Sequence, residues 1–268
     1  MLTGKARLVC LIGKPVSESL SPRMQNAAFA ARSLDWAYVG LAVDPGDLEQ
    51  AAAGLLALGF AGANVTTPYK IAVLSYCDEL DDAAERAGSV NTIVVREGRL
   101  LGSTTDGAAV RDLEPAGMSA LVLGAGGAAQ AVATALAEEG AGGVTIAART
   151  AERAHGLAVR LRTLFPQTEV DARDEWPPSA AGFDLVVNAT PVRDEVLLDD
   201  VHGDQTVVDL AYYGDGRPTA LVQAARDRGC PTVDGLDALV AQGAGSFELW
   251  TGVPAPVEVM RSAIRESP

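Results

Sequence analysis

A glycine-rich segment, Gly124-Ala-Gly126-Gly127-Ala-Ala129, constrains the fold of this chain more than any other feature. It follows the apolar run 120–123 and opens a helical pattern that reaches about residue 139. A strand, a glycine-rich turn and a helix in this order form the dinucleotide-binding fingerprint, in which alanine is an accepted last residue. The glycines permit a tight turn close to a pyrophosphate, and the helix N-terminus offers free N–H groups. The alternative, a turn that binds nothing, is disfavoured because both the strand and the helix are present.

The end of the next predicted strand, residues 144–148, indicates which dinucleotide is bound. Enzymes that use NAD place an Asp or Glu there, which binds the ribose 2′-hydroxyl. Here Ala148 is followed by Arg149 and Thr150, and Arg153 comes shortly after. A guanidinium beside a hydroxyl suits a 2′-phosphate, so we expect NADP rather than NAD. The alternative is that the two arginines are simply solvated at the start of a helix.

The composition excludes several classes of protein. The 268 residues carry a formal net charge of −14, which disfavours nucleic acid and anionic membranes as partners. No apolar run reaches the roughly 18–20 residues of a membrane span, and residues 1–14 lack the pattern of a signal peptide. The three cysteines and two histidines are not spaced as metal ligands, so we expect no metal and a reducing cytoplasm.

Short apolar runs alternate with helical patterns along the chain. Strands are predicted in a first region at residues 8–12, 36–43, 61–65, 89–95 and 99–102. A second region has strands at 120–123, 144–148, 169–171, 184–188, 206–210 and 232–233. Helices are expected at 21–33, 47–58, 80–87 and 150–165, from Pro68 onward and within 243–265, with Ser21, Asp47 and Thr150 as N-caps. This order predicts an α/β fold, with a mainly parallel N-terminal domain and a Rossmann-like doubly wound domain.

Polar residues gather where the strands of the first region begin or end. Ser19 and Ser21 stand before a helix, where two hydroxyls can hold a carboxylate, although Ser21 alone could merely cap the helix. Further polar groups occur in residues 64–70, 89–92 and 104–107. A lone Lys or Asp is ordinarily a surface residue, but Lys70 and Asp106 fall at the mouth of the expected cleft, beyond strand ends where ligands bind in such sheets.

Taken together, these motifs resemble those of the shikimate dehydrogenase family. They keep their order over nearly the whole chain: Gly13-x-Pro15-x-x-x-Ser19-Leu20-Ser21-Pro22, Asn64-Val65-Thr66-x-Pro68-x-Lys70, Ser89-Val90-Asn91-Thr92, Thr105-Asp106-Gly107, Gly124-Ala-Gly-Gly-Ala128, Arg149-Thr150, Asn188-Ala189-Thr190, Asp209-x-x-Tyr212, Gly235-Leu236, Gln242-Gly243 and Phe247-Glu248-Leu249-Trp250-Thr251-Gly252.

The resemblance implies a cytoplasmic oxidoreductase of aromatic amino-acid biosynthesis, which reversibly reduces 3-dehydroshikimate to shikimate with NADPH. It also implies two domains. Residues 1–102 would form the substrate-binding and catalytic domain, and residues 103–240 would form the NADP-binding Rossmann domain. The C-terminal helices, within residues 241–268, are expected to pack back on the first domain.

The resemblance assigns roles to residues of this chain. Lys70 and Asp106 would form the catalytic pair. The substrate would be bound by Ser19, Ser21, Thr66, Asn91, Tyr212 and Gln242, supported by Asn64. NADP would be bound by Gly124, Ala125, Gly126, Gly127, Ala128, Ala148, Arg149, Thr150, Arg153, Thr190, Leu210, Gly235 and Asp82.

The chemistry of the catalytic pair follows from the reaction itself. Hydride that arrives at a carbonyl carbon leaves negative charge on the oxygen. An ammonium group such as that of Lys70 can stabilise this charge and donate a proton. Whether the resting proton lies on Lys70 or on Asp106 stays open at this point.

Several positions depart from the family pattern: Thr104, Ala148, Pro191-Val192-Arg193, Gly214 and Asp237-Ala238. Neutral drift is the simpler explanation, and altered cofactor affinity or relaxed substrate choice is the alternative. Arg193 could add a phosphate contact or could point to solvent.

Two further enzymatic functions remain open. A quinate/shikimate dehydrogenase with relaxed cofactor or substrate choice would share these motifs, and so would an enzyme for an amino analogue of shikimate. A dinucleotide-sensing module that has lost catalysis is disfavoured because Lys70, Asp106 and Gln242 are all present. Either enzyme would take a small-molecule substrate as a monomer or a homodimer.

Overall fold

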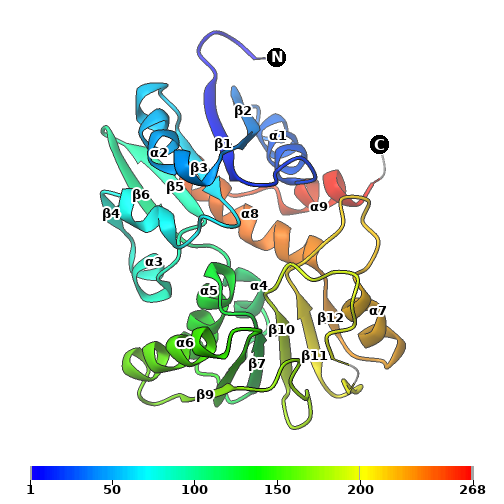
Figure 1. Ribbon diagram of the computed structural model, residues 1–268. Helices are drawn as coiled ribbons and strands as arrows, with labels where there is room; N and C mark the ends of the chain where they lie inside the picture. The colour runs from blue at the N-terminus through cyan, green and yellow to red at the C-terminus, as the bar shows by residue number, and fades with distance from the viewer. Residues whose placement is uncertain (1, 199, 267–268) are drawn as a thin grey trace. The chain divides into compact units, whose positions relative to one another are not determined.

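The computed structural model describes residues 2–198 and 200–266. The chain forms two compact units: unit 1 comprises Met1–Thr105 and Leu239–Pro268, and unit 2 comprises Asp106–Ala238. Figure 1 shows the course of the chain through them. Residues 267 and 268 of the predicted C-terminal helices lie outside the described residues. Within the described part of the chain, no helix is both long enough and apolar enough to cross a bilayer.

Unit 2 contains a sheet of six described strands that are parallel throughout. The strands are β7 (Ser119–Leu123), β8 (Gly143–Ala147), β9 (Glu169–Arg173), β10 (Leu185–Asn188), β11 (Thr206–Asp209) and β12 (Thr232–Val233). Their order across the sheet is β9-β8-β7-β10-β11-β12. This is the doubly wound order of dinucleotide-binding domains. The first three strands are added toward one edge of the sheet, and from the fourth strand on they are added toward the other edge.

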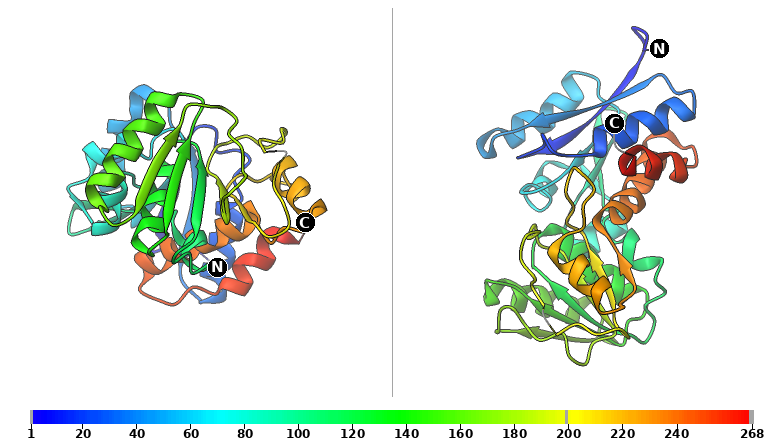
Figure 2. Two further views of the ribbon diagram at one scale, coloured as in Figure 1. Left: turned by 90° about the horizontal axis from the view of Figure 1, so that it is seen from below. Right: turned by 90° about the vertical axis from the view of Figure 1, so that its right-hand side faces the viewer.

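Helices cover both faces of this sheet because its strands are apolar on both sides. Val122 of β7 packs with α5 (Gly127–Glu138) and α6 (Ala151–Leu164) in one buried cluster. Leu121 and Leu123 point the other way and pack with Leu221 of α7 (Ala220–Asp227). Figure 2 shows the strands between these two helical layers. The alanine-rich sequence of α5 lets its backbone approach the sheet closely.

Unit 1 contains a mixed sheet with the order β2-β1-β3-β5-β6-β4. Its strands are β1 (Arg7–Gly13), β2 (Trp36–Ala42), β3 (Gly62–Val65), β4 (Glu79–Leu80), β5 (Thr92–Arg96) and β6 (Arg99–Ser103). Pairs β1–β2, β1–β3 and β4–β6 are parallel, so the sheet is mainly parallel as predicted, while β5 is antiparallel to both of its neighbours. Glu97 and Gly98 both have positive φ and turn the β5–β6 hairpin, as their sequence predicted.

The helices of unit 1 come from both ends of the chain. They are α1 (Ser21–Ala31), α2 (Leu48–Ala57), α3 (Asp82–Ala87), the last part of α8 (Gly235–Thr251) and α9 (Val257–Arg265), with 3₁₀ turns η1 (Pro45–Asp47) and η2 (Ala72–Tyr76). α9 packs beside α1 (Figure 1). Phe29 of α1 stacks on Phe247 of α8 with ring centroids 5.4 Å apart. This aromatic contact and the packing of α9 join the C-terminal helices to α1.

Four local predictions were wrong at the start of helices. Ser21 is the first residue of α1 and not its cap, because the Leu20 carbonyl accepts the Met24 N–H at 3.0 Å and Leu20 therefore occupies the N-cap position. No helix begins at Pro68, because the Lys70 carbonyl accepts the Val90 N–H at 2.8 Å instead of continuing a helical ladder.

Leu80 also lies outside the predicted helix, because it pairs with Gly102 in the sheet. Asp81 then caps α3 through a 2.8 Å bond from the Ala84 N–H. Asp47 and Thr150 do occupy N-cap positions, but neither side chain makes the capping bond. α8 begins at Gly235, well before the predicted start at residue 243.

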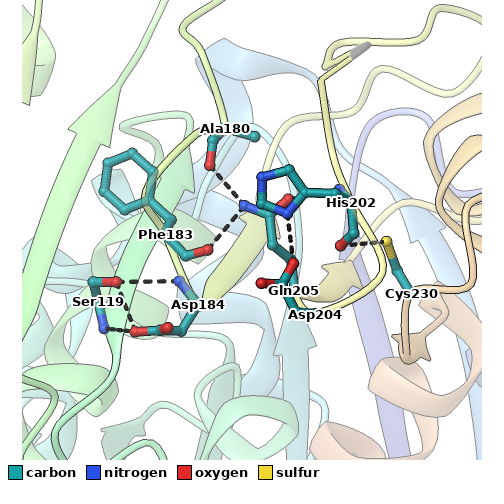
Figure 3. Close-up of polar contacts among 8 residues, drawn as sticks. All are labelled: Ser119, Ala180, Phe183, Asp184, His202, Asp204, Gln205 and Cys230. Carbon is teal, nitrogen blue, oxygen red and sulfur yellow. Dashed lines mark hydrogen bonds and ion pairs between the residues drawn. The ribbon is translucent and has the colours of Figure 1, made fainter.

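At the amino ends of the unit 2 strands, one buried glutamine holds two loops. The Gln205 side chain is 1% exposed and donates to the carbonyls of Ala180, at 2.7 Å, and Phe183, at 2.8 Å. Its own carbonyl accepts the His202 N–H at 2.9 Å (Figure 3). Since all its polar atoms are used inside the protein, Gln205 substitutes for the water that these backbone groups would otherwise bind.

We expect Gln205→Ala to destabilise the protein by about 1–3 kcal/mol, because three backbone groups that are buried or partly buried lose their partner. Urea unfolding followed by circular dichroism measures the change. Gln223→Ala on the exposed side of α7 is the matched control and should change stability by less than about 0.5 kcal/mol. Equal effects of the two variants would contradict the structural role of Gln205.

Candidate functional site

The cofactor signature lies at the point in the unit 2 sheet where the strand order reverses, between β7 and β10. β7 and β10 are neighbours there, and in such sheets ligands bind beyond the carboxyl ends of these two strands. Gly124 follows β7 with φ of +109°, a conformation that favours glycine. A Cβ atom at this position would lie 3.2 Å from the Ala189 carbonyl and 3.3 Å from the Thr190 methyl group. The structure therefore brings Gly124 and Thr190 together at one edge of the sheet.

The N-terminus of α5 fits a pyrophosphate. Gly126 occupies the N-cap position, no side chain caps the helix, and its first turn has no acidic residue. A Cβ atom at Gly126 would meet nothing within 4 Å, so the backbone faces open space. Helix N–H groups and the helix dipole attract anionic oxygens at such a position. Gly126, Gly127 and Ala128 are thus placed to hold the phosphates of a dinucleotide.

The end of β8 fits a 2′-phosphate. The Gly124 N–H donates to the Ala147 carbonyl at 2.8 Å, which puts the glycine-rich turn beside the end of β8. Arg149 and Arg153 are exposed there, whereas the small side chain of Ala148 is buried. No Asp or Glu that could bind the ribose 2′-hydroxyl of NAD stands between Ala147 and Ala151 in the sequence. Two exposed guanidinium groups favour an anionic 2′-substituent.

A buried carboxylate joins the ends of β10 and β11. Asp209 is 0% exposed and accepts hydrogen bonds from the Asn188 amide at 2.9 Å, the Ala211 N–H at 2.9 Å and the Thr219 hydroxyl at 2.5 Å. The side-chain oxygen Oδ1 of Asn188 in turn accepts the Thr190 N–H at 3.0 Å. Burial raises the pKa of the Asp209 carboxyl to about 6, against the opposing effect of these donors. Asp209 thereby orders the loops that carry Thr190 and Tyr212.

The residues expected near the nicotinamide cluster around these loops. Leu210 donates its N–H to the Asn188 carbonyl at 2.9 Å. Gly235 lies against the same segment, since a Cβ atom there would be 2.1 Å from the Ala211 carbonyl and 2.9 Å from Cβ of Tyr212. Leu210, Tyr212 and Gly235 thus share one side of the loop that follows β11, and only glycine allows this close approach of two backbones.

In unit 1, buried amides join three strands to α8. Asn64 at β3 is 4% exposed, and its amide donates to the Asn91 carbonyl at 3.0 Å and the Ser246 hydroxyl at 2.9 Å. The Asn64 carbonyl oxygen accepts the Tyr38 hydroxyl at 2.9 Å. Because these partners occupy both ends of its amide, Asn64 is placed to support the site instead of touching a ligand.

Asn91 extends this network toward Gln242. Its amide donates to the Thr105 hydroxyl at 2.9 Å and to Oε1 of Gln242 at 3.2 Å, and its oxygen accepts the Thr105 N–H at 2.9 Å. The Gln242 amide nitrogen also donates to the Leu239 carbonyl at 3.1 Å. Gln242 stays half-buried while Asn91 is 2% exposed. The structure thus brings together Asn64, Asn91 and Gln242 from distant parts of the sequence.

The remaining predicted substrate residues lie at the ends of β1 and β3. Thr66 is half-buried directly after β3, and its side chain packs against Gly13 at the end of β1. Ser19 and Ser21 stand at the start of α1, where Ser21 is 5% exposed. Their hydroxyls are polar groups at a helix N-terminus, which suits a carboxylate.

The two residues predicted to form the catalytic pair belong to different units. Lys70 is half-buried in unit 1, and Asp106 is the first residue of unit 2. Asp82 begins α3 in unit 1, is largely exposed and pairs with Arg86 at 3.7 Å. The roles of these residues stay predictions.

In the described part of the chain, no group of three or more His, Cys, Asp and Glu side chains is arranged to hold a metal ion.

Sequence reasoning missed two contributors to these networks. Ser246 is 0% exposed and contacts Asn64, Thr92 and Thr105. It stands four residues after Gln242, so the helical period could have placed both on one face. Asp209 was only part of a motif, and no pattern in the sequence shows that its carboxylate is buried.

Asp209→Asn should change stability in a pH-dependent way. The folded pKa, about 6, lies above the ordinary value of 3.8, so the native state retains the proton more strongly than the unfolded chain. Wild-type stability from this group is therefore greatest below about pH 4 and is lost as the pH rises through about 6. The unfolding free energy of the variant minus that of the wild type should therefore increase by on the order of 2 kcal/mol from pH 4.5 to pH 7.5, because the wild type loses stability over this range.

Asp184→Asn is the control with the opposite sign. Hydrogen bonds from Ser119, at 2.8 Å from its N–H and 2.7 Å from its hydroxyl, lower the pKa of this exposed carboxyl (Figure 3). Its contribution is present at neutral pH and lost on acidification, so this variant should become relatively less stable as the pH rises. Chemical denaturation at both pH values measures each difference. A pH-independent difference for Asp209→Asn would contradict the burial effect.

Comparison with known proteins agrees with this geometry. Three family models match: the shikimate dehydrogenase substrate binding domain at residues 11–93, shikimate / quinate 5-dehydrogenase at 109–209, and the shikimate 5'-dehydrogenase C-terminal domain at 235–265. The NADP(+) shikimate dehydrogenase of Rubrobacter xylanophilus is 46% identical, over 98% of this chain and 97% of that protein.

Solved structures agree in fold. A shikimate dehydrogenase in complex with NADP+ has a TM-score of 0.89 at 36% identity and covers 98% of this chain and 96% of its own. The enzyme of Thermus thermophilus, in complex with NADP(H) and shikimate, has a TM-score of 0.85 at 33% identity, covering 97% of this chain and 98% of its own. This chain belongs to the shikimate dehydrogenase family.

Proposed function

We propose that this protein is an NADP-dependent shikimate dehydrogenase, which reversibly reduces 3-dehydroshikimate to shikimate. Family membership over nearly the whole chain is the observation that carries the proposal. Unit 2 adds an uncapped helix N-terminus and two exposed arginines, which suit NADP. Unit 1 adds hydroxyls and amides, which suit a small, hydroxylated acid.

The substrate is held by groups that match its chemistry. The hydroxyls of Ser19 and Ser21 bind the carboxylate, and Thr66, Asn91, Tyr212 and Gln242 bind the ring and its hydroxyls. Asn64 holds Asn91 through the bond to its backbone carbonyl, and Asn91 in turn binds Oε1 of Gln242. The Ser246 hydroxyl donates to the backbone carbonyl of Gln242 at 3.2 Å and so adds a second contact on Gln242. A site built to hydrogen-bond hydroxyls rejects analogues that lack them, since its buried polar groups are then left unpaired.

Lys70 and Asp106 transfer the proton. When bound, NADP would supply the hydride exchange at the carbon that carries the reacting oxygen. In the reductive direction the Lys70 ammonium stabilises the charge that develops on that oxygen and donates the proton, while the Asp106 carboxylate supports the ammonium. In the oxidative direction the pair accepts the hydroxyl proton.

A steady-state assay with shikimate and with quinate, each against NADP+ and NAD+, tests this function. Shikimate with NADP+ should give the highest kcat/KM. Quinate is the second candidate because the family model at residues 109–209 covers both acids. A protein that binds NADPH but changes the absorbance at 340 nm with neither acid would be the sensing module instead. We propose that the enzyme acts in the cytoplasm as a monomer or homodimer.

Lys70→Ala should lower kcat by roughly 10²–10⁴-fold with little change in the KM for shikimate, because it removes proton transfer and charge stabilisation. Lys5→Ala is a control that also removes one ammonium group, from an exposed position in unit 1. Steady-state kinetics with saturating NADP+ measures both. Near-normal turnover by Lys70→Ala would remove this residue from the mechanism.

Arg149→Asp should reverse the cofactor preference. The new carboxylate repels a 2′-phosphate and can bind a ribose 2′-hydroxyl, so the ratio of kcat/KM for NADP+ to that for NAD+ should fall about 100-fold or more. Arg96→Asp in the β5–β6 hairpin makes the same change of charge in unit 1 and should leave the ratio unaltered. An unchanged ratio in Arg149→Asp would count against the predicted phosphate contact.

A further inference from the structure

Arg193 occupies the loop that follows β10 in unit 2. Its guanidinium Nη1 donates to the backbone carbonyl of Tyr212 at 3.0 Å. The Arg193 carbonyl accepts the Ala220 N–H at 2.8 Å. Both side chain and main chain of Arg193 therefore hold the segment that follows β11.

The neighbouring Tyr213 ring reinforces this contact. The Arg193 guanidinium carbon lies 5.2 Å from the ring centroid, and that of Arg217 lies 3.8 Å from it. The Tyr213 hydroxyl donates to the Asp194 carboxylate. Cation–π contacts and this hydrogen bond tie the two loops together at a second point.

The carbonyl that Arg193 binds belongs to Tyr212, a residue assigned to the substrate. A bond to this oxygen orients the peptide plane after Tyr212 and so restricts the backbone from which the Tyr212 side chain projects. The base of the same loop is fixed separately by Asp209, which accepts from Ala211 and Thr219. Arg193 thus acts on the part of the loop that the buried carboxylate does not reach.

We propose that Arg193 is a positioning residue, which sets Tyr212 for substrate binding and makes no contact of its own with the cofactor phosphates. The inference deepens the proposed function and rests on it. The contacts of the guanidinium with a neutral carbonyl and a ring face, together with its half-buried state, support a structural use of its donors. A residue that binds phosphate would instead direct the N–H donors of its guanidinium group toward the ligand.

Kinetics of Arg193→Ala separates these two roles. The KM for shikimate should rise about five- to fiftyfold, because a charge-assisted bond to the Tyr212 segment is lost. The KM for NADP+ should change less than about twofold, and kcat should change little, since Tyr212 binds ground state and transition state alike. Arg193→Lys keeps one donor and should give an intermediate KM for shikimate. A selective rise in the KM for NADP+ would overturn the proposal in favour of a phosphate contact.

Arg228→Ala is the matched control. Arg228 also donates from Nη1 to a backbone carbonyl, that of Ala224 at 3.1 Å, but at the C-terminus of α7. Its loss should leave all kinetic constants within about twofold of wild type. Melting curves of both variants show whether a general loss of stability accompanies the kinetic change.

A double-mutant cycle with Tyr212→Ala tests whether Arg193 acts through Tyr212. If it does, Arg193→Ala should raise the KM for shikimate less than about twofold in the Tyr212→Ala background, so the two effects are strongly non-additive. Additive effects would overturn the proposal. A wild-type protein that turned over no shikimate would overturn the proposed function as well, whereas an active wild type with an unchanged KM in Arg193→Ala would overturn this inference alone.

Discussion

The hydrogen bond between Asn188 and Asp209 is the interaction on which the cofactor side of this enzyme depends. It joins the last residues of two adjacent parallel strands, inside a sheet that is covered on both faces. Three donors satisfy the Asp209 carboxylate, but burial without a cation still raises its pKa. An apolar pair at these positions would avoid that cost, yet it would give the Thr190 and Tyr212 loops no common anchor.

In unit 1, neutral amide groups instead of a carboxylate connect the strand ends. Asn64 and Asn91 occupy the ends of neighbouring strands, and their amides bind backbone, hydroxyl and side-chain amide partners. An amide both donates and accepts, so it can connect strands to α8 without burying charge. Each unit therefore uses a buried polar pair to order the loops beyond its strands, and those loops carry the residues assigned to ligands.

Much of the fold followed from local patterns, because strand period, glycine-rich turns and helix length are properties of short segments. The glycine signature predicted the doubly wound sheet, and the Glu97-Gly98 turn predicted the hairpin. The errors occurred where a distant partner competed with a local signal. Pro68 matched the pattern of a helix start, but the Lys70 carbonyl accepts the Val90 N–H and so makes no helical hydrogen bond. Leu80 fitted a helix by period but pairs with Gly102 in the sheet.

The sequence by itself determined the family, the class of cofactor and the set of residues available for catalysis, because these depend on residue identity and short-range spacing. Only the tertiary structure decided how those residues are supported. The buried Asp209 carboxylate, the Ser246 hydroxyl and the Arg193 guanidinium each bind a residue from another segment of the chain. Such contacts arise from packing of whole elements, so no local pattern records them.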